Sequence, residues 1–402
     1  MMKNIVSKSL LMTGMASMII AGATAQTNSN LIGQINTITT AVPFLLICPD
    51  SRAGGMGETG VASSPDVSSI HWNTAKLAFS NKNFGIGLSY SPWLRQLVDD
   101  INLAYLSFYK KVKDNQAFGG SLRYFSLGNI TFTDNVGNVT GQFNPNEFAI
   151  DMAYSRKLGE EISGGIALRY INSNLTGGYE VGGARTKAGQ SIAADISAYW
   201  THDLEVADKE SNIAVGLAIT NIGSKISYSE TGTKDFIPTN LRLGSCFKMN
   251  LNDYNEVSFN VDFNKLLVPT PPAYERDSAT GELIIVAGKF PDVSVAKGMF
   301  QSFSDAPGGW KEEMQEIIWQ LGFEYWYDKQ FSFRAGYFHE APTKGNRQFF
   351  TLGAGLRYNV FGLDFAYLIP TEQRNPLENT LRFTLSFEFD KNTGDKKEST
   401  TE

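Results

Sequence analysis

The sequence predicts an all-β protein: an antiparallel transmembrane β-barrel of about 14 strands with an N-terminal plug segment and one long extracellular loop. Three observations support this fold class. From Asn83 onward, apolar and polar residues alternate in segments, the period of a strand whose two faces meet different surroundings. The connections between these segments alternate between short and long. Aromatic residues reach 12% and charged residues only 19%, below the ~25% typical of soluble domains.

The N-terminus predicts a secretory signal peptide over residues 1–25. Lys3 and Lys8 supply the positive region, and residues 10–21 form a short apolar core. Ala23-Thr24-Ala25 is a small-x-small cleavage site, which places the mature start near Gln26. The apolar core is too short for a membrane anchor.

Residues 26–82 lack the alternation and are predicted to form a periplasmic or lumen-filling plug. Their apolar stretch at 42–47 argues against a disordered tail. The glycines at 54–57 do not lie between a strand and a helix, so we interpret them as close-packing positions rather than a phosphate-binding loop. The proposed plug motif comprises Arg52, Gly54, Gly55, Met56, Gly57, Trp72 and Asn73.

Residues 83–390 are predicted to form the barrel wall. In the last segment, Leu381, Phe383 and Leu385 share one face, and Arg382 and Thr384 share the other. An even number of antiparallel strands suits closure, which leaves no unpaired edge in lipid. The predicted spans are 83–91, 100–111, 115–127, 145–158, 161–173, 188–203, 211–223, 237–250, 254–266, 314–327, 330–340, 346–359, 361–369 and 379–390.

The loop lengths predict the orientation in the membrane. Short turns face the periplasm in outer-membrane barrels and long loops face outward. Every long connection follows an odd-numbered predicted strand, so the first strand runs outward and both termini are expected in the periplasm. The alternative, a soluble β-sandwich, also alternates but does not account for this asymmetry. Residues 391–402 form a polar C-terminal tail.

The polar face of the predicted wall carries ionisable residues of both signs. We expect them to form a lumen charge network that satisfies a polar interior, with a transport pathway as the alternative interpretation. The residues are Arg123, Arg169, Arg242, Arg334, Arg357, Arg382, Asp151, Asp195, Asp262, Glu324, Asp364 and Glu388.

The segment 267–313 is far longer than a common loop. Long loops on a rigid scaffold often carry function, and exposed aromatic residues indicate a protein partner. The alternative is that the loop folds over its own barrel. A helix start is suggested at Asp305, running to Met314. The partner-binding residues proposed here are Tyr274, Phe290, Met299, Phe300, Phe303 and Trp310.

Other chemistry finds little support. Cys48 and Cys246 could pair in the periplasm as a disulfide between plug and wall, although two free buried thiols are the commoner arrangement. No metal-ligand spacing, cofactor motif or catalytic constellation stands out, so we expect neither a metal, nor a cofactor, nor an enzyme. The mildly acidic charge, −6 at pH 7, argues against nucleic-acid binding.

The plug segment also resembles a known family. The run from Ala41 to Gly57 (AVPFLLICPDSRAGGMG), followed by ETGVA at 58–62, SPD at 64–66 and HWNTA at 71–75, resembles the PorV (LptO) family of the type IX secretion system of Bacteroidota. That family is related to the FadL-like barrels, which often show Asn-Pro-Ala where this chain has Asn73-Thr74-Ala75. The missing proline weakens any transfer of fatty-acid transport.

The resemblance implies an outer-membrane shuttle without catalytic activity. PorV-like proteins bind the C-terminal signal domains of secreted cargo, collect cargo from the translocon barrel and deliver it to an attachment complex that contains a sortase-like protease. It also implies that the outward loops, above all 267–313, meet the translocon or cargo. The alternatives are a FadL-like channel for hydrophobic small molecules and a structural barrel that scaffolds partners.

Overall fold

The computed structural model describes residues 35–95, 98, 100–133, 136–178, 180–181, 184–229, 232–372 and 375–390. The predicted signal peptide and C-terminal tail lie outside these residues. No helix among the described residues is long and apolar enough to cross a membrane.

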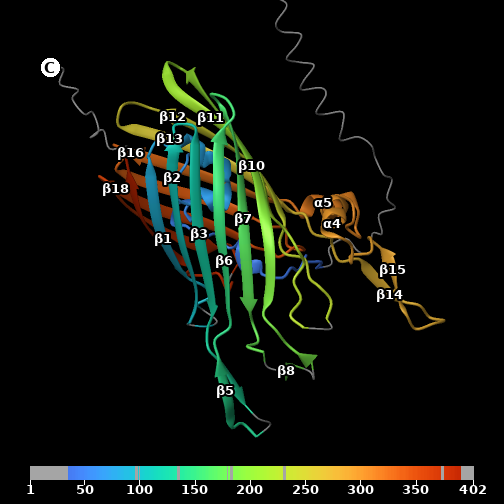
Figure 1. Ribbon diagram of the computed structural model, residues 1–402. Coiled ribbons are helices and arrows are strands. Elements are labelled where there is room, and N and C mark those ends of the chain that lie inside the picture. Colours follow the sequence, from blue (N-terminus) through green and yellow to red (C-terminus); the bar gives the residue numbers. More distant parts are fainter. Residues whose placement is uncertain are drawn as a thin grey trace, which may run out of the picture.

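Fourteen antiparallel strands close into a barrel, which confirms the predicted fold class (Figure 1). Each strand pairs with its neighbour along the barrel, and the last pairs with the first, Phe84 opposite Phe389. The barrel strands are β1 Phe84–Pro92, β2 Ile101–Lys113, β3 Gln116–Leu127, β6 Asn146–Lys157, β7 Ile162–Asn174, β10 Gly189–Val206, β11 Lys209–Gly223, β12 Asn240–Asn250, β13 Asn255–Leu266, β16 Ile318–Tyr327, β17 Phe331–His339, β18 Gln348–Tyr358, β19 Phe361–Pro370 and β20 Leu381–Phe389.

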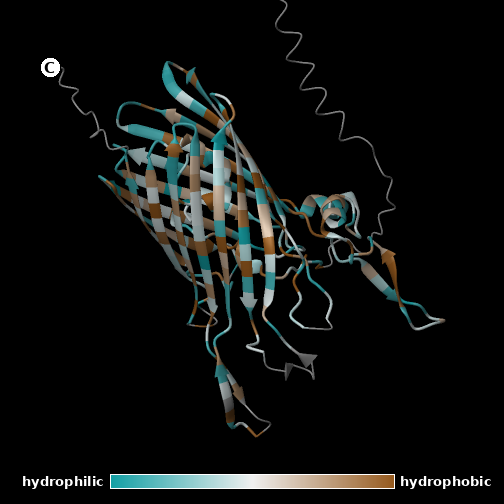
Figure 2. Cartoon of the chain, in the orientation of Figure 1, coloured by the Kyte–Doolittle hydropathy of each residue, from teal (hydrophilic) through white to brown (hydrophobic). Residues whose placement is uncertain are grey.

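The wall has the parity that the sequence predicts. On β20, Arg382, Thr384 and Ser386 are buried toward the lumen, whereas Phe383 faces outward and is exposed in the isolated chain. Apolar and polar residues therefore alternate along the strands in Figure 2. The outward apolar positions form the surface that contacts lipid.

The two ends of the barrel differ in their connections. Several turns at one end have positive φ at their central residues, such as Ala207 and Asp208 between β10 and β11, which matches the twist of a tight hairpin. We call this the short-turn end. The long-loop end carries three small hairpins, β4–β5 (Ile130–Thr133, Val139–Phe143), β8–β9 (Glu180–Val181, Ala184–Arg185) and β14–β15 (Ala273–Arg276, Leu283–Ala287), together with helices α4 Val295–Gln301 and α5 Trp310–Gln315.

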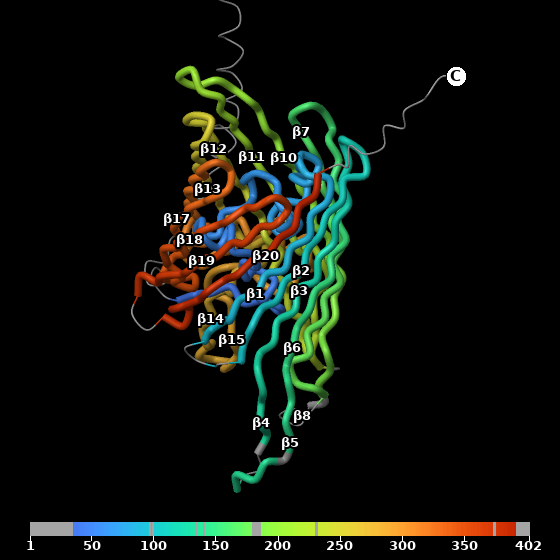
Figure 3. The backbone as a smooth tube through the Cα atoms, turned by 90° about the vertical axis from the view of Figure 1, so that its left-hand side faces the viewer, coloured from blue at the N-terminus to red at the C-terminus, as the bar shows by residue number. Residues whose placement is uncertain are grey.

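The plug segment fills the lumen, as the sequence predicts (Figure 3). Its described residues contain four short helices, η2 Pro43–Leu46, α2 Ser51–Gly54, α3 Ser69–Trp72 and η3 Thr74–Phe79. Helices α2, α3 and η3 pack against β2, β3, β6, β7, β10, β18, β19 and β20. Nearly every described residue from Ala41 to Ser80 is buried, either within the plug or against the inner face of the wall.

The described chain begins and ends at opposite ends of the barrel. Asn36 lies at the long-loop end, where its backbone N–H donates to Thr343 O (2.9 Å). Lys82 lies at the short-turn end, where its ammonium pairs with Asp390 (2.9 Å). The plug therefore runs through the lumen from the long-loop end to the short-turn end. The expectation that both termini are periplasmic concerns residues outside the described ones and stays a prediction. The mature start near Gln26 is outside the described residues.

Candidate functional site

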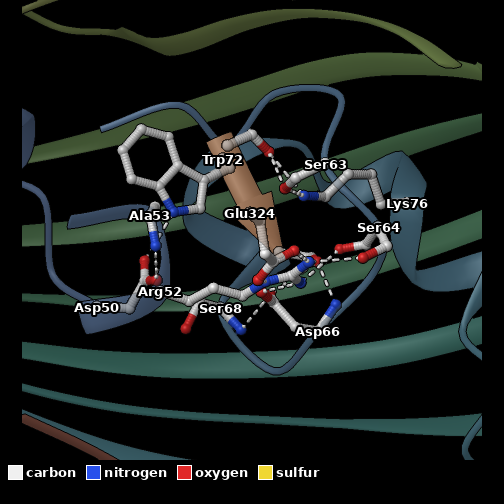
Figure 4. Close-up of polar contacts among 12 residues, drawn as sticks. Asp50, Arg52, Ala53, Ser63, Ser64, Asp66, Ser68, Trp72, Lys76 and Glu324 are labelled. Atoms are coloured by element: carbon white, nitrogen blue, oxygen red, sulfur yellow. Dashed lines mark hydrogen bonds and ion pairs between the residues drawn. The ribbon is translucent and has the colours of Figure 1, made fainter. Parts of the chain in front are cut away.

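The plug is fixed to the wall through the Arg52 side chain (Figure 4). Arg52 Nε and Nη2 donate to the two carboxylate oxygens of Glu324 on β16, at 3.0 and 2.7 Å, in a bidentate pair. Its Nη1 pairs with Asp66, a second plug residue, at 3.1 Å. A guanidinium matches a carboxylate in this fork geometry. The pair therefore fixes the orientation of α2 and also neutralises the charge of Arg52.

The Arg52–Glu324 pair continues around the wall as a ladder of ion pairs. Glu324 also accepts from Arg334 (2.8 Å), Arg334 pairs with Asp364 (2.7 Å), and Asp364 pairs with Arg357 (2.7 Å). Except for Arg357, whose side chain is a quarter exposed, these side chains are buried, so breaking the ladder would strand charges away from water.

The remaining lumen charges bind the plug or each other. Arg169 pairs with Asp151 (2.6 Å) and Asp195 (3.0 Å), and also contacts Asn221. Arg382 pairs with Glu58 (2.7 Å), and Asp262 accepts the backbone N–H groups of Gly60 and Val61 (2.7 and 2.9 Å).

Four of the twelve predicted lumen residues form no ion pair within the described part of the chain: Asp262, which binds the plug backbone as above, and Arg123, Arg242 and Glu388. Arg123 donates to Leu45 O (2.7 Å) and contacts His71 Nδ1. Arg242 donates to His71 O (3.3 Å), and Glu388 accepts from the Tyr109 hydroxyl (3.3 Å). The structure thus places all twelve residues on the inner face, but as several separate clusters.

Burial at the plug changes its acid–base behaviour. Desolvation, together with the nearby Arg123 and Arg242 guanidinium groups, lowers the pKa of His71 well below its ordinary value, so the imidazole is neutral. Desolvation and the Asp66 carboxylate raise the pKa of Asp50 to about 6. Asp50 caps α2 through Ala53 N–H (2.9 Å) and accepts from Trp72 Nε1 (2.7 Å), contacts that hold the two plug helices together.

The proposed plug motif consists of contact residues. Gly57 has φ of +66°, and a Cβ there would lie 2.6 Å from Leu321 O on the wall; a Cβ on Gly55 would lie 3.0 Å from Gly353 Cα, and one on Gly54 would meet Arg382. Asn73 Nδ2 donates to Val61 O and to Ala198 O, both at 3.0 Å, which joins the plug to β10. Met56 and Trp72 are buried.

The suggested disulfide does not form. Cys48 and Cys246 are both free and buried. Cys48 packs with Ala53 and Trp72, whereas Cys246 belongs to a separate apolar cluster with Ala62 and Tyr199. The path of the plug places the two thiols in different contacts, which the sequence does not reveal.

The connection between β13 and β16 divides into a hairpin and a helical part. Of the proposed partner-binding residues, Tyr274 lies on the hairpin β14–β15, and Phe290, Met299, Phe300, Phe303 and Trp310 lie on or around the helices. Met299 is partly buried, and the other five are exposed, up to 81% for Phe300. Helix α5 begins at Trp310 rather than at Asp305 as predicted, because Asp305 is buried, with its carboxylate 3.3 Å from the Thr270 N–H.

The hairpin presents an apolar strand that our choice of aromatic residues missed. Leu283, Ile284, Ile285 and Val286 on β15 are all exposed, and the hairpin projects away from the barrel (Figures 1 and 2). The signal was in the sequence, as a run of four apolar residues between Gly281 and Gly288. Such a run on an exposed strand is unfavourable in water and indicates a binding surface.

A buried clasp holds the helical part to the barrel. Lys265 pairs with Glu313 and Glu316 (3.1 and 2.6 Å), and Lys344 pairs with Glu312 and Glu316 (2.6 and 3.0 Å). Desolvation and the Glu313 and Glu316 carboxylates raise the pKa of Asp305, beside the clasp, to about 6.

A comparison with protein families decides the assignment. The family model described as type IX secretion system protein PorV matches residues 30–273, more than half of the 402-residue chain. The chain belongs to the PorV family. This confirms the resemblance, and it assigns the barrel to the outer membrane as a type IX secretion component. The match covers the plug and the wall as far as β13, and it ends at the first residue of β14.

Solved structures give a weaker likeness. The CymD monoaromatic hydrocarbon channel shares 15% identity over 86% of this chain and 99% of its own, with a TM-score of 0.47. The Pseudomonas putida toluene transporter TodX shares 11% over 89% and 100% (TM-score 0.46), and a Pseudomonas aeruginosa FadL homologue shares 13% over 88% and 99% (TM-score 0.42). No curated protein matches this PorV family member in sequence.

Proposed function

We propose that this protein is the cargo-binding shuttle of the type IX secretion system. It binds the C-terminal signal domains of secreted proteins, takes them from the translocon barrel and passes them to the sortase-like attachment complex at the cell surface. It has no catalytic role of its own. In this proposal the long-loop end faces outward, and the short-turn end, with Asp390, faces the periplasm.

One observation carries the proposal beyond family membership: an apolar surface projects from a barrel whose lumen is occupied. The hairpin β14–β15 exposes Leu283 (64%) and its three apolar neighbours at the long-loop end. The plug meanwhile fills the barrel with buried residues and ion pairs. A protein that worked through its lumen would need an open path, whereas one that worked by binding would need this exposed surface.

The hairpin can be tested directly. A Leu283→Asp, Ile285→Asp variant places two charges on one face of β15. We expect it to lose co-purification of the translocon barrel and of cargo and to reduce surface delivery of cargo. Val139→Asp on β5 is the matched control, because Val139 is equally exposed (65%) on another hairpin at the same end. Unchanged secretion and binding in the double variant would refute the role of the hairpin.

The alternative is a channel for hydrophobic small molecules. A recess of about 320 Å³ at the long-loop end, lined by Pro43, Leu46 and Ile47 of the plug and by Ile318 and Arg347 of the wall side, is the observation in its favour. Uptake of a monoaromatic hydrocarbon or a long-chain fatty acid by cells that produce this chain alone would support the channel. Loss of cargo delivery without any change in uptake in the hairpin variant supports the shuttle.

A further inference from the structure

Helix α5 lies at the rim of the long-loop end, where one of its faces packs against the outer surface of the wall. On its other face, Glu312 accepts from Asn36 Nδ2 at the start of the plug (2.9 Å). The contact with the outer surface involves Lys265 of β13. Its side chain points outward, because it lies an even number of residues from the outward-facing Phe259 and Phe263. A lysine on the lipid-facing side is costly unless it is covered and paired. Glu313 and Glu316 cover it, and the Lys265 side chain is only 9% exposed. The clasp therefore docks one face of α5 on the outside of the barrel rim.

A groove of about 220 Å³ runs between this helix and the wall. The wall contributes outward side chains of β12 and β13, namely Leu241, Leu243 and Phe263. The helical part contributes Phe303, Trp310, Met314 and Ile317. The charged lining residues Lys265 and Glu313 neutralise each other, so the groove offers an apolar surface with no free charge.

We propose that this groove binds an acyl chain of a membrane lipid from the leaflet at the long-loop end. The wall side of the groove is continuous with the lipid-contacting surface of the barrel. Leu243 stands opposite Phe263, and Val261, two residues along β13, stands opposite the exposed Leu321 on β16. Hydrocarbon that covers this part of the wall can therefore extend under Trp310 and Met314 without leaving an apolar surface. Trp310, 66% exposed, has the amphipathic side chain typical of membrane interfaces.

A peptide segment fits this groove less well than a hydrocarbon chain. The backbone groups of β12 and β13 already pair with β11, with each other and with β16, so no strand edge is free. A peptide in the groove would lose the hydration of its N–H and C=O groups without gaining partners, whereas an acyl chain has no such groups.

Lipid quenching tests the proposal. In a Cys48→Ala, Cys246→Ala background, a bimane fluorophore is attached at Met314→Cys in nanodiscs of phosphatidylcholine with or without brominated acyl chains. Phe259→Cys on the lipid-facing wall is the positive control, and Leu283→Cys on the hairpin is the negative control. We expect fluorescence at position 314 to be lost to an extent comparable with position 259, while position 283 keeps its signal.

A groove-filling variant separates binding in the groove from simple immersion of the helix. Leu243→Phe adds volume inside the groove without introducing an indole, which would itself quench bimane, and is expected to reduce the bromine-dependent loss of fluorescence at position 314. Position 259 should stay quenched, and heat-modifiable gel mobility shows that the barrel is folded. A label at position 314 that resists quenching like position 283 overturns the proposal and leaves the groove to a protein partner. Equal bromine-dependent quenching with and without Leu243→Phe also overturns it.

Native mass spectrometry of chains that keep both cysteines gives a readout that does not depend on a fluorophore. Chains released from phosphatidylcholine nanodiscs should retain a phospholipid, and Trp310→Ala should retain fewer. If the two chains retain phospholipid equally, the groove is not the binding site.

Discussion

The attachment of the plug to the wall can be weakened by a single substitution, Glu324→Gln. Glu324 accepts from both Arg52 on the plug and Arg334 on the neighbouring strand, at distances between 2.7 and 3.0 Å. Glutamine keeps the shape of the side chain but removes its charge and one of its two acceptor oxygens. Two buried guanidinium groups then share one neutral acceptor.

The cost of this change follows from what each arginine retains. Removing one partner of a buried ion pair costs about 3–5 kcal/mol. Arg52 keeps Asp66 and Arg334 keeps Asp364, so we place the cost at the lower end, about 3 kcal/mol. That energy raises the population of a loosened plug roughly 100-fold, because each ~1.4 kcal/mol is a factor of ten.

Limited trypsin digestion of the protein in detergent measures this population. Arg52 and Lys76 are buried cleavage sites in the plug, and cleavage that follows rapid opening reports the open fraction. We expect cleavage in the plug to accelerate by about two orders of magnitude in Glu324→Gln while the barrel keeps its heat-modifiable mobility. The matched control is Asp390→Asn, which breaks an exposed pair with Lys82 and should change the rate by less than about tenfold. Equal rates in the two variants would refute the reasoning.

Three further predictions concern the plug and the clasp. Gly57→Ala should lower the melting temperature far more than Gly137→Ala, because both have positive φ but only the Cβ at position 57 meets the wall; equal losses would mean that backbone conformation alone matters. The pKa of Asp305 is raised to about 6, so its contribution to the stability of the clasp is present below its ordinary pKa of 3.8 and lost as the pH rises through about 6. Asp305→Asn should therefore flatten the pH dependence of hydrogen exchange over residues 270–316, and an unchanged profile would contradict this. Burial raises the pKa of Cys48 and shields Cys246, so both thiols should resist maleimide in the folded protein and react after unfolding, with non-reducing mass mapping as the check.

The wall was predictable from the sequence because lipid and lumen impose opposite requirements on successive residues. Each barrel strand was expected within a few residues of its observed bounds, and the inward position of Arg382 followed from the apolar neighbours Leu381 and Phe383. The alternation of apolar and polar residues is a local pattern, so it can be read along each strand separately. Closure of the sheet into a barrel follows because an open strand edge in lipid is too costly.

The plug and the long connection were less predictable because non-local contacts fix them. Helix α2 is only four residues long, and it is stabilised by the Asp50 cap and by Arg52 binding to Glu324, 272 positions away. The clasp likewise joins Lys265 to Glu316, so the start of α5 depends on a contact that no local motif encodes. Whether Cys48 and Cys246 form a disulfide likewise depends on the path of the plug through the lumen, which non-local contacts fix.

The energetics of the plug bear on which proposed function is tenable. Opening a path along the wall would break at least the Arg52–Glu324 and Arg382–Glu58 pairs, which join plug to wall. At about 3 kcal/mol each, the two together limit an open state to roughly one chain in 10⁴ unless a partner offsets the cost. A channel that worked alone would then conduct faster when the plug is loosened, so Glu324→Gln should raise uptake of hydrophobic small molecules. A shuttle that works through its outer surface gains nothing from a loosened plug, and the same variant should leave cargo delivery unchanged as long as the barrel and hairpin remain folded.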